Sequence, residues 1–91
     1  MTLQLLCWNT VRDYEVWKAR FDGDLPRAAE AGLRLAALWR DVDAPETAHF
    51  LFDVEDRARA EAFMADPESV RSGELAGVLD GGAVFVRPEP A

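Results

Sequence analysis

The chain has 91 residues, which fit one small domain and leave no room for two. Hydrophobic residues make up 49% of it, enough to build a core, so disorder is excluded as the default state. The formal net charge is -7 and the basic residues are scattered, which disfavours binding to nucleic acid or to an anionic membrane surface.

A single cysteine, Cys7, excludes an internal disulfide framework and gives no sign of export. The first six residues are apolar but carry neither a basic leader nor a cleavage site. No apolar run reaches the length of a membrane span. We therefore expect a soluble cytoplasmic protein in which residues 1–91 form one domain, with residues 88–91 as a tail.

The first predicted strand covers residues 3–10 and has large apolar side chains on both faces, which is typical of a covered, central strand. Asp13 then suits the N-cap of a helix. Tyr14, Trp17 and Phe21 follow at helical spacing, so this helix should pack one aromatic stripe against the sheet.

Two residues interrupt this helical pattern, Gly23 and Pro26, and they predict a kink or a break. A second helical piece is expected from Leu25 to Ala31. Asp24 can cap its start, and Gly32 fits its C-terminal end.

A β-hairpin is predicted from two apolar runs, residues 33–41 and 47–54, because the residues between them contain Asp and Pro in turn chemistry. The second run is apolar on both faces, so it should be a central strand. Alternation predicts a shared face for four residues of the first run: Leu33, Leu35, Ala37 and Trp39.

The length of the hairpin loop also sets a register. If Asp41 lies opposite Thr47, then Trp39 lies opposite His49. The side chains of Trp39 and His49 should then share one face of the sheet.

A further helix is predicted over residues 56–64, with Asp56 opening it. The Asp-Pro pair at residues 66–67 either ends this helix or begins a short additional turn. Two glycines at residues 81–82 are expected to turn the chain into a last strand over residues 83–87.

The element order β-α-β-β-α-β predicts an α+β fold of the ferredoxin-like type. Right-handed crossovers and antiparallel pairing give the sheet order 4-1-3-2 with both helices on one face. Strands one and three then lie in the centre, in agreement with their two apolar faces. The helices leave the other face uncovered, so we expect a homodimer in which the sheet of a second copy covers it.

Four segments resemble a known family: Asp13–Asp22 (DYEVWKARFD), Ala31–Leu33 (AGL), Trp39–Glu46 (WRDVDAPE) and Ala62–Glu68 (AFMADPE). They are similar to the dimeric α/β-barrel superfamily, and within it to small proteins labelled cyclase-like or antibiotic-biosynthesis-monooxygenase-like. The resemblance implies two sheets that close into a barrel across a dimer, with a pocket between sheet and helices in each subunit. Members include cofactor-free oxygenases, polyketide cyclases, muconolactone-type isomerases, haem-degrading enzymes and proteins without known activity.

The candidate catalytic residues lie where antiparallel neighbours bring strand ends and the start of the first helix to one edge of the sheet. His49, the only histidine, suits a proton shuttle, or else it is a structural histidine bonded to a neighbour. Asp41 is the alternative base if it is desolvated. Asn9 could orient a carbonyl or cap the turn, and Tyr14 could donate to an enolate oxygen or fill the core.

The candidate substrate-binding residues are mainly aromatic. Trp17, Trp39, Phe21 and Phe63 could line a pocket for a flat ligand, or fill the core and the dimer seam. Arg40, on the outer strand, either binds a carboxylate or keeps that edge from pairing wrongly.

The sequence predicts neither a metal site nor a cofactor. One histidine and one cysteine do not make a zinc site, and the glycines form no phosphate loop. The function we expect first is that of a cofactor-independent cyclase or isomerase acting on a hydrophobic, polyketide-like or aromatic molecule through enol chemistry. The alternatives are a cofactor-free monooxygenase of the same substrates and a non-catalytic dimer, which a packed interior would favour.

Overall fold

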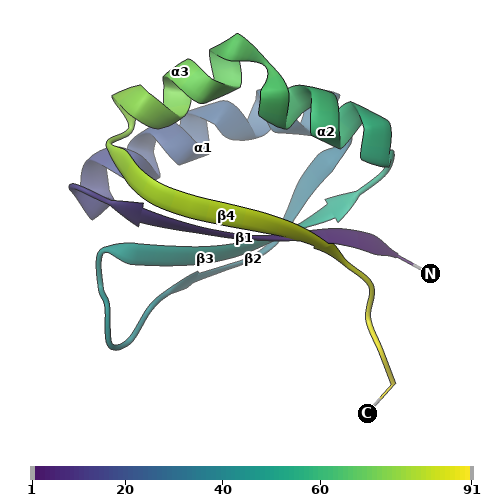
Figure 1. The fold of residues 1–91 in the computed structure, drawn as a ribbon, viewed down its shortest axis with the longest axis horizontal. Coiled ribbons are helices and arrows are strands. Elements are labelled where there is room, and N and C mark those ends of the chain that lie inside the picture. The colour runs from purple at the N-terminus through teal and green to yellow at the C-terminus, as the bar shows by residue number, and fades with distance from the viewer. Residues whose placement is uncertain (1, 91) are drawn as a thin grey trace.

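The computed structural model describes residues 2–90, arranged in two layers with the helices above the sheet (Figure 1). The fold is α+β and ferredoxin-like, as predicted, with one helix more than expected. The elements in chain order are β1 (Leu3–Val11), α1 (Tyr14–Glu30), β2 (Leu33–Arg40), β3 (Thr47–Val54), α2 (Arg57–Ala65), α3 (Pro67–Leu75) and β4 (Val78–Val86).

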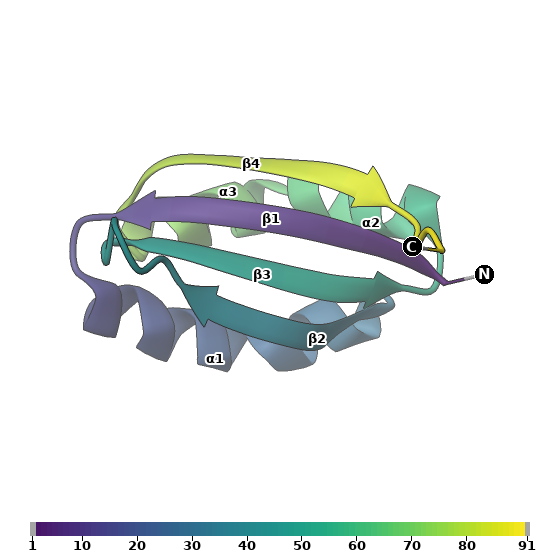
Figure 2. The same ribbon diagram turned by 90° about the horizontal axis from the view of Figure 1, so that it is seen from below.

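The four strands form one antiparallel sheet in the order β2-β3-β1-β4, which is the predicted order (Figure 2). Trp39 pairs with His49 across the hairpin, so the predicted register is confirmed. On the other side of β3, Trp8 of β1 also pairs with His49. These three side chains therefore share one face of the sheet.

The core lies between the sheet and the helices. Along β3, Ala48, Phe50, Phe52 and Val54 are buried, while the residues between them are only half-buried. This alternation shows that β3 is fully covered on its helix-facing side alone. The opposite face of the sheet carries no helix.

α1 runs without interruption from Tyr14 to Glu30, so of the predicted kink or break at Gly23 and Pro26 the break is wrong, and residues 25–31 form no separate helical piece. Asp13 caps the helix as predicted, because its carboxylate accepts hydrogen bonds from the N–H groups of the first turn. Asp24 lies within the helix and is not a cap.

Packing explains why the helix continues. A proline removes one backbone hydrogen bond and crowds the preceding turn, but neighbouring contacts can hold the helix in place. Trp17 and Ala28, on either side of Gly23 and Pro26, are both buried against the sheet. The helix ends at Glu30, and Gly32, with a φ of 80°, follows the cap residue Ala31.

β2 has an irregular register between Leu35 and Ala37. Leu35 pairs with Phe52, which faces the helices, whereas Ala37 pairs with Leu51 on the opposite face. One extra residue between them turns the second half of the strand over. The single face predicted for alternate residues over 33–39 is therefore wrong.

β4 begins at Val78, directly after a turn in which Gly77 has a φ of 81°. Residues 81–82, predicted to form this turn, lie inside the strand, and that prediction is wrong. A Cβ atom on Gly82 would lie 2.7 Å from Nε1 of Trp8 on the neighbouring strand. The glycine is thus required by the close approach of an indole ring.

The second helical region consists of two helices. Asp56 caps α2 by accepting from the N–H of Arg59 at 3.2 Å. Asp66 caps α3 by accepting from the N–H of Glu68 at 2.8 Å, and Pro67 occupies its first turn. None of the helices within residues 2–90 is long and apolar enough to cross a membrane.

Replacing Gly23 with alanine is expected to stabilise the protein by roughly 1 kcal/mol, because glycine is the poorer helix former. The added Cβ meets nothing within 4 Å. Urea denaturation followed by circular dichroism measures the difference. The matched control, Gly82→Ala, should destabilise the protein because its Cβ collides with Trp8. A Gly23→Ala protein less stable than the parent would contradict an unbroken α1.

Candidate functional site

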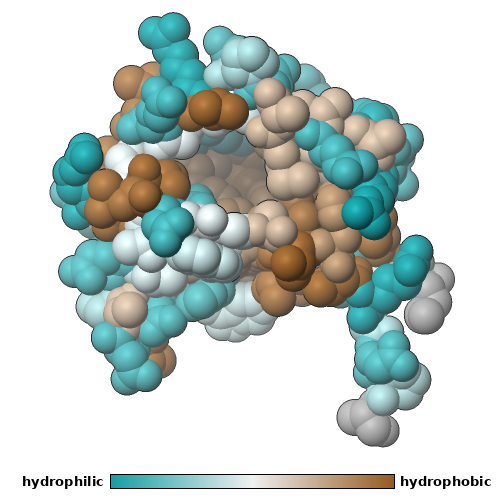
Figure 3. All heavy atoms as spheres, viewed as in Figure 1, coloured by the Kyte–Doolittle hydropathy of each residue, from teal (hydrophilic) through white to brown (hydrophobic). Residues whose placement is uncertain are grey.

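A cavity of about 170 Å³ lies between the sheet and the helices, with walls from α1, α3 and β3. A neighbouring hollow of about 340 Å³ lies beside β4 and α2. Figure 3 shows the surface hollowed between the two layers. The two spaces share four lining residues: Asn9, Phe50, Phe52 and Phe63. Together they give the domain room for a small ligand.

Aromatic rings form the floor of this cavity. Trp17 stacks on Phe21 with 4.7 Å between ring centroids, and Phe21 meets Phe50 edge-on at 5.0 Å. Phe50 and Phe52 are perpendicular at 5.8 Å. Trp17, Phe21 and Phe63, three of the predicted substrate-binding residues, all line the cavity.

Asn9 lies on the helix-facing side of β1 and lines both spaces. With its amide oriented to suit its neighbours, its nitrogen donates to the carbonyl of Trp8 at 2.8 Å and its oxygen accepts from Nε1 of Trp17 at 3.2 Å. A side-chain amide has two N–H donors, so the second remains for a ligand oxygen.

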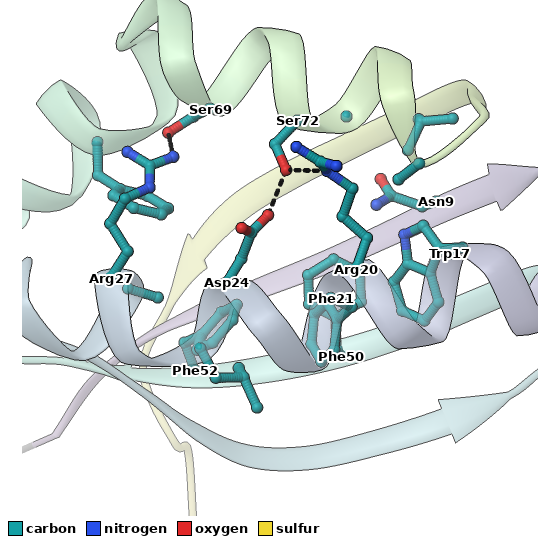
Figure 4. A pocket seen from close by; sticks show the side chains of 16 residues that line it. Asn9, Trp17, Arg20, Phe21, Asp24, Arg27, Phe50, Phe52, Ser69 and Ser72 are labelled. Atoms are coloured by element: carbon teal, nitrogen blue, oxygen red, sulfur yellow. Dashed lines mark hydrogen bonds between the residues drawn. The ribbon is translucent and has the colours of Figure 1, made fainter.

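Polar side chains form the wall opposite the aromatic floor (Figure 4). Nε of Arg20 donates to Oγ of Ser72 at 2.9 Å, and the Ser72 hydroxyl donates to the carboxylate of Asp24. Farther along α1, Nη2 of Arg27 donates to Oγ of Ser69 at 2.7 Å. These bonds bridge α1 to α3 across the cavity.

The spacing of three charged residues in the sequence indicates this polar wall, but only if the helix that carries them is continuous, and a break was predicted there. Arg20, Asp24 and Arg27 follow the i, i+4, i+7 spacing of one helical stripe. A break at Gly23 assigns the first of them to a different helix from the other two. In the continuous α1 they share one side and meet the serines of residues 69–72.

His49 and Asp41 lie on the other face of the sheet, because His49 alternates with buried, helix-facing Phe50. Nε2 of His49 lies 2.8 Å from Oδ2 of Asp41. The Asp41 carboxylate also accepts from the backbone N–H groups of Asp43 and Ala44. The hydrogen bond from His49, with smaller contributions from these N–H groups, lowers the pKa of Asp41.

The remaining predicted site residues are Trp39 and Arg40, at the end of β2, and Tyr14, at the start of α1. The guanidinium carbon of Arg40 lies 4.1 Å from the ring centroid of Tyr14, and Nε of Arg40 donates to the carbonyl of Pro45 at 2.7 Å. Trp39 is half-exposed on the helix-free face. The sheet thus separates Trp39 from Asn9, and the predicted site residues do not meet in one pocket.

Cys7 lines the hollow beside β4, and burial raises the pKa of its thiol to about 12. A thiol of such high pKa stays protonated near neutral pH and is a poor nucleophile. Within residues 2–90, no group of three or more His, Cys, Asp or Glu side chains is placed to hold a metal ion.

The sequence matches no protein-family model and no curated protein. The fold matches several solved structures over almost their whole length. A provisionally named antibiotic biosynthesis monooxygenase from Bordetella bronchiseptica has a TM-score of 0.79 at 16% identity, covering 98% of both chains. SnoaB, a cofactor-independent oxygenase from Streptomyces nogalater, has a TM-score of 0.76 at 14% identity, covering 99% of this chain and 95% of that one.

The chain shares its ferredoxin-like fold with these solved structures named antibiotic biosynthesis monooxygenase or cofactor-independent oxygenase. A NIPSNAP domain protein from Burkholderia xenovorans shares it with a TM-score of 0.67 at 15% identity, covering 96% of this chain and 94% of that one. The resemblance read from the sequence is therefore confirmed for the fold. Identities this low carry no activity from one protein to another.

Asp41→Asn is expected to destabilise the protein at neutral pH but not at low pH. The pKa of Asp41 lies below its ordinary value of 3.8 in the folded state, so its stabilising contribution is present above that value and is lost as the pH falls through the folded pKa. Thermal melting of parent and variant across this range measures the effect. The control is Asp43→Asn, which makes the same change in the same turn without removing the carboxylate bonded to His49. A difference that persists undiminished in acid would contradict the assignment.

Proposed function

We propose that the protein is a small cytoplasmic enzyme that acts, without a cofactor, on a flat hydrophobic aromatic molecule. The observation that carries the proposal is a single cavity in which aromatic rings, an amide donor and a carboxylate meet. An open cavity also counts against the purely assembling dimer, for which a packed interior was expected. The site is the space between sheet and helices.

Asp24 is the candidate base, because it is the carboxylate that lines this cavity. It accepts a hydrogen bond from Ser72, which fixes its orientation. A carboxylate held beside an apolar floor can remove a proton from an activated C–H group of the ligand. The free N–H of Asn9 can then bind the oxygen on which the negative charge develops.

Of the two chemistries that begin with such a carbanion, we favour oxygenation. The carbanion transfers an electron to O₂ and the two radicals join as a peroxide. The carbon then loses its second hydrogen as the O–O bond breaks. A ring CH₂ group thereby becomes C=O, one oxygen atom is incorporated and the other leaves as water. The likeness to SnoaB, named a cofactor-independent oxygenase, supports the preference for oxygenation over cyclisation or isomerisation.

Cyclisation or isomerisation is the second candidate. The same base and donor would form an enolate that attacks a carbonyl within the ligand and consumes no oxygen. The polar wall supports this alternative, because Arg20 and Arg27 offer N–H donors to the several carbonyl oxygens of a polyketide chain.

Asp24→Asn is expected to slow turnover by roughly 10²–10⁴-fold, because it removes the base and leaves the shape of the side chain unchanged. The assay uses anthrone, a tricyclic ketone with an acidic ring CH₂ group, and follows oxygen uptake together with the quinone product. One O₂ consumed per anthraquinone formed supports the oxygenase, whereas conversion to the enol tautomer anthranol without oxygen uptake supports isomerisation.

His49→Gln tests the base predicted from the sequence in the same assay. His49 lies across the sheet from the cavity, so this variant should retain the parent's rate. Loss of turnover in folded His49→Gln, with Asp24→Asn unaffected, would return the base to the pair formed by His49 and Asp41. Circular dichroism verifies that each variant is folded.

The helix-free face of the sheet is the proposed dimer surface, joined to the same face of a second copy. Large apolar side chains are exposed on it, with Leu6 at 40%, Trp39 at 50% and Val84 at 56%. Strand pairing places Trp8 and Leu51 on the same face. Contiguous apolar surface of this kind on a small domain marks an interface, and symmetric homodimers are the commonest solution.

Leu6→Glu is expected to give monomers, because it places a charge at the centre of the apolar face. Sedimentation velocity at micromolar concentration should show a dimer for the parent protein and half that mass for the variant. Val42→Glu is the control, since Val42 is 94% exposed in the hairpin loop. A parent protein that sediments as a monomer would contradict the proposed dimer.

A further inference from the structure

The positive and negative charges of the side chains that line the cavity are unequal in number. The charged side chains are two arginines and one aspartate: Arg20, Asp24 and Arg27. Arg20 and Asp24 are both bonded to Ser72, so their opposite charges offset each other at close range. Among residues 2–90, Arg27 has no carboxylate as an ion-pair partner, although the net charge of the chain is -7.

Arg27 is held in place by neutral groups alone. Its Nη2 donates to the hydroxyl oxygen of Ser69, and its guanidinium carbon lies 4.6 Å from the ring centroid of Phe63. It forms no ion pair with a carboxylate among residues 2–90. The side chain is nevertheless half-buried. A guanidinium carries five N–H donors in a planar fork, so most of them remain for a ligand.

The contact with the ring of Phe63 and the bond to Ser69 together hold the guanidinium in the cavity wall, where a planar partner can reach its free N–H groups. Carboxylates bind such a fork through two parallel N–H···O bonds. Ser69 can add a third bond, because its oxygen accepts from Arg27 and its own hydrogen is free to donate. The aromatic floor begins beside this group, with Phe63, Phe52 and Phe21 lining the same cavity.

We infer that the ligand of this cavity is an aromatic carboxylate, with Arg27 and Ser69 binding the carboxylate while the rings lie on the aromatic floor. The inference rests on the proposed function and deepens it, since that proposal specifies a flat hydrophobic aromatic ligand and the inference adds a carboxylate to it. A purely hydrophobic substrate, as expected from the sequence, would leave Arg27 partly desolvated and unpaired.

A structural role for Arg27 is the competing explanation. The residue lies in the last turn of α1, where a cation favours the helix dipole, and its bond to Ser69 joins α1 to α3. Either effect would stabilise the fold without selecting a ligand. The two explanations differ in whether Arg27 discriminates an anion from a neutral molecule of the same shape.

The test compares 2-naphthoate with 2-naphthamide by isothermal titration calorimetry on the full chain. The two probes have nearly the same size and shape and differ in charge. The parent protein should bind 2-naphthoate roughly 10- to 100-fold more tightly, because hydrogen bonds to a charged group are the stronger ones. Added salt should weaken binding of the anion and leave the amide unaffected.

Arg27→Gln should abolish this preference, and Arg27→Lys should restore part of it, since lysine keeps the charge but loses the planar fork. Arg71→Gln is the matched control, because Arg71 is an exposed arginine on α3 that does not line the cavity. It removes the same charge and should keep the full preference. Thermal melting of each variant separates a loss of selectivity from a loss of stability.

Two results overturn the inference, and they differ in what they mean for the proposed function. If both probes bind equally well, or Arg27→Gln keeps the preference, the ligand is not selected for its carboxylate and the proposed aromatic site stands. If neither probe binds the parent protein, the cavity takes no fused-ring aromatic and both proposals fail. A melting temperature lowered by Arg27→Gln with selectivity unchanged assigns Arg27 the structural role.

Discussion

The unbroken course of α1 across β3 is the constraint on which the rest of the structure depends. Proline and glycine inside a helix cost about 3 and about 1 kcal/mol relative to alanine. Burying a large apolar side chain contributes roughly 1.5–3 kcal/mol. Trp17 and Phe21 pack on Phe50 before the two helix breakers, and Ala28 is buried after them, so contacts on both sides hold the helix together across Gly23 and Pro26. The tertiary contact therefore decides a local conformation that residue preference alone would reverse.

The continuity of α1 also creates the two sides of the cavity. Its aromatic stripe supplies part of the floor, and the neighbouring stripe of Arg20, Asp24 and Arg27 supplies the polar wall. The bonds from this stripe to the serines of α3 hold α3 across an open space. A domain this small keeps a cavity because polar bridges, and not apolar side chains, span the gap between two of its helices.

The sequence predicted the elements whose signals are local. The aspartates at 13, 56 and 66 cap or open helices as their chemistry suggests, and the apolar faces of residues 3–10 and 47–54 identify central strands. The errors have long-range causes. The bulge after Leu35 moves Trp39 to the helix-free face. The glycine at residue 82 lies inside a strand because the indole ring of Trp8, on the neighbouring strand, leaves no room for a side chain. The site was missed for the same reason, since its polar residues meet only when α1 and α3 are both in place.

The two faces of the sheet are connected through β1, where adjacent residues point in opposite directions. Trp8 lies on the helix-free face against Gly82, while Asn9 lies in the cavity and donates to the carbonyl of Trp8. Gly81 pairs with Asn9, and a Cβ atom at residue 81 would lie 2.9 Å from the carbonyl oxygen of Trp8, so a glycine here leaves room beside the carbonyl that accepts from Asn9.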